Sequence, residues 1–60
     1  MIVKAIYEPT EIQCYINLDY VIDIFPQADG RLFAYTIDSE RGAYVISQKD
    51  LEVWIKLKKQ

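Results

Sequence analysis

Few side chains in this 60-residue chain could carry out catalysis or bind a metal. Histidine is absent, which removes the commonest general base and the commonest metal ligand. The single cysteine, Cys14, cannot build a zinc site alone, and a nucleophilic thiol needs a nearby base or cation. With two glycines in all, no glycine-rich phosphate loop is present. We therefore expect a non-enzymatic protein without a cofactor or metal.

Carboxylates are the remaining route to catalysis, but a small domain offers little room for the dry pocket that raises a carboxyl pKa. Asp29, Asp38 and Glu40 fall in predicted turns. The simplest interpretation is that Asp29 forms a turn and that the other two are solvated charges. As a functional hypothesis, the three form an acidic patch that attracts a basic protein surface.

Aromatic side chains suggest a binding surface, because Tyr and Trp are enriched at the centres of protein interfaces. The chain has five tyrosines, two phenylalanines and one tryptophan, more than so small a core can hold. Tyr15, Tyr35 and Trp54 are the candidates for exposed contact residues. The other large aromatics are predicted to fill the core, namely Tyr7, Phe25, Phe33 and Tyr44.

Composition indicates one small globular domain over residues 1–60, with 52% hydrophobic and 27% charged residues. One cysteine allows no intrachain disulfide, so we expect a cytoplasmic location rather than a secreted one. No stretch approaches the roughly 18 apolar residues of a membrane helix, and the N-terminus lacks an export pattern.

The net charge of −2 is unevenly distributed along the chain. Residues 1–48 carry seven acidic and three basic side chains, whereas residues 49–60 carry four lysines and two acidic residues. Because nucleic-acid binding relies on neutralising phosphates with Lys and Arg, an acidic body argues against duplex binding. The C-terminal lysines are expected to form a solvated fringe.

Alternating apolar residues and turn signals predict five short strands. Residues 2–7 stop before Pro9, and residues 12–16 alternate so that Cys14 is a buried, inert packing residue. Residues 20–25 hold one charged residue, which predicts a central, well-covered strand.

Glycines mark the two later hairpins. Asp29-Gly30 closes the turn over residues 26–30, since glycine tolerates a positive φ. Residues 31–37 are predicted to form the second strand of this hairpin, and a loop over residues 38–42 leads into a strand over residues 43–46. These segments predict a three-stranded antiparallel meander.

Residues 47–60 fit two structures. Ser47 followed by Asp50 is related to a helix capping box, and Leu51, Trp54 and Ile55 would then share one helical face. The alternation of residues 53, 55 and 57 equally predicts a strand. A helical turn near Ser47 is common to both, and residues 52–58 stay open between strand and helix.

This order of elements resembles a Src-homology-3-like barrel, with five strands and a helical turn before the last. Residues 5–8, Ala-Ile-Tyr-Glu, are similar to the Ala-Leu-Tyr-Asp motif that opens Src-homology-3 domains, and residues 42–47 are similar to the family's Gly-Tyr-Ile-Pro-Ser segment. The resemblance implies the barrel. It does not imply the family's polyproline ligand, because only Tyr7 of the groove is present and Ile46 stands at the proline position.

Residues 16–19, Ile-Asn-Leu-Asp, lead into an apolar segment over residues 21–24. This part is similar to small bacterial proteins of the flagellar-regulator type, a resemblance that implies a helical C-terminus.

The sequence therefore predicts a mostly β fold, either a small five-stranded antiparallel curled sheet or a Src-homology-3-like barrel, with a short helix or helical turn starting near Ser47. The expected function is a protein-interaction module, self-associating or docking on a larger protein as a bacterial or phage accessory or inhibitory protein. The alternatives are single-strand nucleic-acid binding and a structural subunit of a homo-oligomer.

Overall fold

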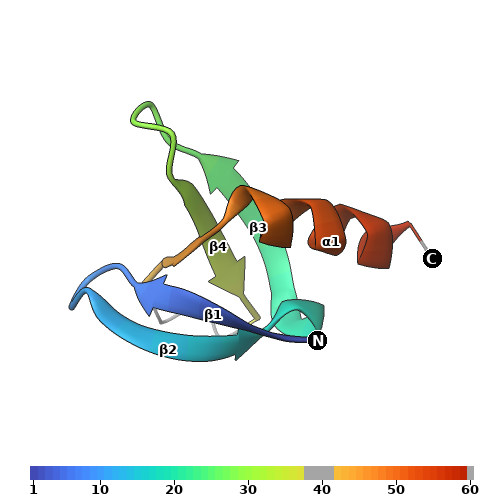
Figure 1. The fold of residues 1–60 in the computed structure, drawn as a ribbon, viewed down its shortest axis with the longest axis horizontal. Helices are drawn as coiled ribbons and strands as arrows, with labels where there is room; N and C mark the ends of the chain where they lie inside the picture. Colours follow the sequence, from blue (N-terminus) through green and yellow to red (C-terminus); the bar gives the residue numbers. More distant parts are fainter. Residues whose placement is uncertain (38–41, 60) are drawn as a thin grey trace.

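A computed structural model describes residues 1–37 and 42–59 of the chain (Figure 1). One curled antiparallel sheet has the strand order β2-β1-β5-β4-β3, and a single α-helix follows it. The elements are β1 (Ile2–Tyr7), β2 (Ile12–Asn17), a 3-10 helix η1 (Leu18–Tyr20), β3 (Val21–Pro26), β4 (Leu32–Thr36), β5 (Tyr44–Ile46) and α1 (Gln48–Lys58). The predicted mostly β fold, with five strands and a helix starting near Ser47, is confirmed.

The hairpin turns follow local residue preferences. Gly30 has a φ of 93°, which favours glycine, and its N–H donates to the Gln27 carbonyl at 3.0 Å. This confirms the predicted hairpin between β3 and β4. In the turn between β1 and β2, Glu11 has a φ of 58° and its N–H donates to the Tyr7 carbonyl at 2.8 Å. Of the second predicted loop, residues 38–41 lie outside the described residues.

The close approach of Gly42 to the turn between β1 and β2 explains the glycine before β5. A Cβ atom at Gly42 would lie 2.5 Å from Pro9 Cγ, so a side chain there would require Pro9 or the backbone to move. The Gly42 N–H also donates to the Tyr7 hydroxyl at 3.1 Å. These contacts hold the start of β5 against the end of β1, where Tyr7 and Tyr44 are paired in register.

The prediction that residues 20–25 form a central, covered strand is wrong. Within the described residues, β3 pairs with β4 alone and lies at one rim of the sheet, while the short β5 sits between β1 and β4. Ile22 and Phe25 on this strand are 49% and 53% exposed. Pro26 at its end has no N–H for a further strand, which suits an edge position.

Packing of η1 and α1 against one face of the sheet forms the core. Leu18 and Val21 are fully buried, and they join inward-facing residues of β1, β4 and β5. From α1, apolar side chains pack against this cluster, namely Leu51, Val53, Trp54 and Leu57. The sheet therefore has an inner face, which the helix partly covers, and an outer face.

The open choice for residues 52–58 is settled as helix. Ser47 Oγ accepts the Asp50 N–H at 3.1 Å, and Asp50 Oδ2 accepts the Ser47 N–H at 3.3 Å, which completes a capping box. Farther along, the Trp54 Nε1–H donates to the Val21 carbonyl at 3.0 Å. The helix is thus fixed at its start and clamped to the first residue of β3.

Replacing Trp54 with phenylalanine should lower the free energy of unfolding by about 1–3 kcal/mol, because the Val21 carbonyl loses its indole donor. Urea unfolding followed by far-ultraviolet circular dichroism measures the change without relying on tryptophan fluorescence. The control Lys56→Ala, at an exposed site of the same helix, should stay within about 0.5 kcal/mol of wild type. Equal stability of wild type and Trp54→Phe would contradict the clamp.

Candidate protein-binding surface

The outer face of the sheet carries a continuous row of apolar side chains across four strands. Ile6 pairs with Val45, Val45 pairs with Phe33, and Phe33 pairs with Phe25. Directly paired residues project from the same face, and these four alternate with the residues that face the core. Ile6 is 42% exposed and Phe25 is 53% exposed, while Val45 and Phe33 are half-buried. We call these four residues the outer row.

Tyr35, a predicted contact residue, lies beside one end of the outer row. Its ring stands edge-on to that of Phe25, with 5.7 Å between centroids and 75° between planes. It is half-buried on β4, and its partner across the ladder is the exposed Asp23. The structure therefore brings Tyr35 together with the outer row.

Asp29 also lies next to this surface, through Arg31. The Arg31 guanidinium carbon is 5.1 Å from the centroid of the Phe33 ring, and Arg31 Nε is 2.7 Å from Asp29 Oδ2. The Arg31 backbone N–H donates to Asp29 Oδ1 at 3.0 Å. That backbone bond is the main reason why the pKa of Asp29 is lowered; desolvation opposes it, and the Arg31 guanidinium adds to the lowering. Asp29 is thus the predicted turn former, and it also positions the arginine over the ring.

Acidic side chains border the outer row on the β1 side. Glu8 and Glu11 reach a shallow hollow of about 170 Å³ beside it. The remaining lining residues are Ile6, Arg31 and Val45. The predicted acidic residues Asp38 and Glu40 lie outside the described residues. Among the described residues, the carboxylates that border this surface are Glu8, Glu11 and Asp23, and Arg31 is a neighbouring cation.

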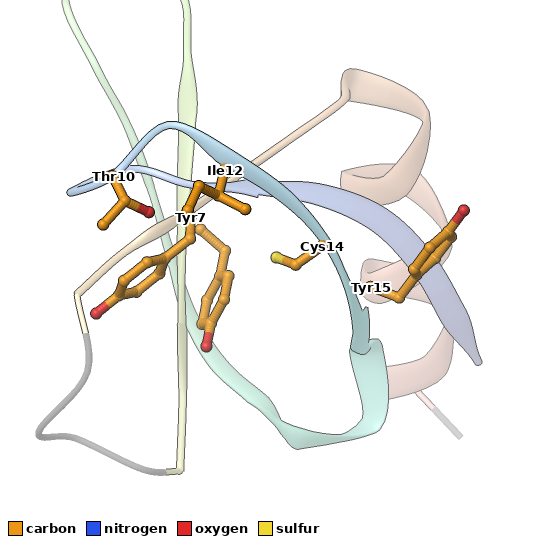
Figure 2. A pocket seen from close by; sticks show the side chains of 6 residues that line it. Tyr7, Thr10, Ile12, Cys14 and Tyr15 are labelled. Carbon is orange, nitrogen blue, oxygen red and sulfur yellow. The ribbon is translucent and has the colours of Figure 1, made fainter.

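Tyr15 lies elsewhere, on the edge strand β2, and is 67% exposed. Next to it is an open pocket of about 480 Å³ (Figure 2). The ring centroids of Tyr7 and Tyr44, which both line this pocket, are 5.3 Å apart. In Figure 2 the Tyr15 ring points away from Tyr7 and Cys14. The pocket is lined by Tyr7, Thr10, Ile12, Cys14, Tyr15 and Tyr44.

Two predictions for β2 need correction. Ile12 is 63% exposed, and Cys14 is a half-buried free thiol that lines the pocket rather than a fully buried residue. Only Ile16 of the predicted alternation is buried. The reason is the edge position of β2: Ile16 lies near η1, whereas Ile12 lies at the far end of the strand.

Trp54 lies on the opposite side of the sheet from the outer row. It is half-buried against the core, with its indole N–H bonded to Val21. A variant at this position would disturb the fold, so Trp54 is a poor probe of binding. Among the described candidates, Tyr35 and Asp29 therefore lie beside the outer row, whereas Tyr15 and Trp54 do not.

Sequence reasoning missed the outer row. The sequence predicts Phe25 and Phe33 in the core, but Phe25 is exposed and Phe33 lies on the outer face. One signal was available, because Pro26 at the end of β3 favours an edge strand. For Ile6 and Val45 no local signal existed, since their pairing joins residues 39 positions apart in the chain.

No three or more His, Cys, Asp or Glu side chains gather as a metal site among residues 1–37 and 42–59. In the same described part of the chain, no helix is long and apolar enough to cross a membrane.

The pKa of Asp29 should lie below its usual value of 3.8 when carboxyl carbons are titrated by NMR. In Arg31→Gln the pKa of Asp29 should rise only part of the way toward 3.8, because the backbone N–H bond persists. A depressed folded-state pKa stabilises the fold above the unfolded-state pKa, and this contribution disappears as the pH falls through the folded-state value. Titration of wild-type Asp29 at or above 3.8 would contradict the geometry.

Comparison with known proteins adds no identity: no protein-family model, no curated protein and no solved structure matches this chain. The resemblance to Src-homology-3 domains and to flagellar-regulator-type proteins therefore stays a prediction, and function is inferred from the surface itself.

Proposed function

We propose that this chain is a non-enzymatic protein-interaction module that docks on a larger protein through the outer face of its sheet. The observation that carries the proposal is the outer row, which crosses four paired strands without a polar interruption. Its expected role is that of an accessory or inhibitory protein in the cytoplasm.

Exposed aromatic and aliphatic groups support this function. Contiguous apolar patches on small proteins commonly mark interaction sites, and rigid aromatic rings supply large contact area at little cost in side-chain entropy. Phe25 and Tyr35 form an edge-on pair, and Arg31 lies over Phe33. Tyr and Arg are residue types enriched at the energetic centres of interfaces.

Charge around the outer row indicates the chemistry of the partner. Glu8, Glu11 and Asp23 border it, whereas the charge of the neighbouring Arg31 is paired with Asp29. A complementary surface would therefore present apolar side chains with Lys and Arg around them. The same carboxylates would repel phosphates. Single-strand nucleic-acid binding therefore has less support, although aromatic rings on a sheet resemble its stacking platforms.

Phe25→Ser should weaken binding to the partner roughly thirtyfold, equivalent to about 2 kcal/mol, because it removes the most exposed ring of the outer row. The partner is first captured from a lysate of the source cell and identified by mass spectrometry, and its affinity is then measured by calorimetry with purified proteins. Tyr20→Ser is the matched control, since Tyr20 is a 56% exposed aromatic residue in η1, outside the outer row.

Retention of one protein by wild type and Tyr20→Ser, but not by Phe25→Ser, is the expected result. Binding should also weaken at higher salt, as an acidic border implies. Equal retention by all three proteins, or no specific partner for any of them, would overturn the proposal. A ligand that proves to be nucleic acid would do the same.

A further inference from the structure

The edge strand β2 lacks the features that usually keep sheet edges apart. Its six residues include no charge and no proline, and its register with β1 is regular throughout. The other edge strand, β3, contains Asp23 and Pro26 and has a register irregularity between Val21 and Asp23. One edge of this sheet is therefore protected and the other is open to pairing.

Main-chain groups at β2 are directed toward the open edge. The Leu18 N–H donates to the Met1 carbonyl at 2.8 Å, and the Glu8 N–H donates to the Ala43 carbonyl at 2.9 Å. Along a strand of an antiparallel ladder, the N–H and C=O groups of one residue point toward the neighbouring strand and those of the next residue point to the opposite side. The N–H and C=O groups of Gln13 and Tyr15 therefore point away from β1, and no strand pairs with this side of β2 in the described residues.

Side chains on both faces of β2 are also uncovered. Tyr15, on the outer side, is 67% exposed, and Ile12, on the inner side, is 63% exposed. A strand added at this edge would cover both of them. For so small a core, burial gained by association would add appreciably to stability.

A second copy of the chain is the occupant that these features fit. Two-fold antiparallel pairing of one uncharged strand with itself places no like charges opposite one another. Gln13 and Tyr15 of one copy can exchange main-chain hydrogen bonds with the same residues of the other. Because the contact is isologous and the β3 edge is protected, assembly stops at two copies.

We propose that the chain forms a homodimer by antiparallel pairing of two β2 strands, which joins two five-stranded sheets into one. This inference does not rest on the proposed function, because β2 contributes no residue to the outer row. The dimer would present two outer rows, so a partner with two matching sites would be held more tightly by avidity.

Light scattering after gel filtration tests the proposal under reducing conditions, so that Cys14 cannot crosslink the copies. Wild type should have twice the 7.1 kDa chain mass and dissociate on dilution. Tyr15→Lys should raise the dimer dissociation constant at least about tenfold, because it places lysines near the pairing axis. Ile22→Lys also replaces an exposed apolar side chain with lysine, but on the protected edge strand; it is the control and should leave dimerisation unchanged.

Amide hydrogen exchange gives a second readout at the edge itself. In the wild-type dimer the Gln13 amide should exchange at least about tenfold more slowly than in monomeric Tyr15→Lys, while the Val3 and Ala5 amides, within the ladder of β1, should differ little. A wild-type monomer at all concentrations would overturn the proposal. So would a dimer that survives Tyr15→Lys, or one in which the Gln13 amide exchanges freely.

Discussion

Cross-strand register decides which side chains of this sheet meet the helix and which meet solvent. Side chains alternate along a strand, so a slip of one residue would exchange the two faces completely. On β1 the register with β2 and β5 turns Val3 and Ala5 toward the core and Ile6 outward. The outer row exists because the β1–β5, β5–β4 and β4–β3 pairings all place residues of the same sheet face opposite one another. The contact between Gly42 and Tyr7 helps to hold the β1–β5 register.

In the described residues, no helix packs against the outer face of the sheet. More than half of the residues are hydrophobic, yet a single short helix follows the sheet and can cover only its inner face. Small domains bury a smaller share of their surface than large ones. Trp54 anchors that helix through the Val21 carbonyl, next to the fully buried Leu18. In the described residues, α1 packs against neither the outer face nor the β2 edge.

Local chemistry made much of the fold predictable. Asp29-Gly30 specified a turn with positive φ, and Ser47 with Asp50 specified a helix start. The C-terminal choice was ambiguous because residues 53–57 satisfy both periods, and the packing of α1 against the core, in which Trp54 takes part, decides it. Strand order was beyond such reasoning, since β5 inserts between β1 and β4 through long-range pairing. The prediction that Phe25 is buried failed for this reason: its exposure depends on which strand lies beside β3.

Solvent paramagnetic relaxation tests the assignment of faces most directly, because a soluble gadolinium chelate relaxes protons according to their exposure. We expect strong relaxation of the Ile6 methyl and Phe25 ring protons, and weak relaxation of the Leu18 and Val21 methyls. This difference should hold for a monomer or a β2-paired dimer, since neither covers the outer row. Protection of Ile6 and Phe25 equal to that of Leu18 would mean that the register or the strand order is different, and the proposed binding face would not exist.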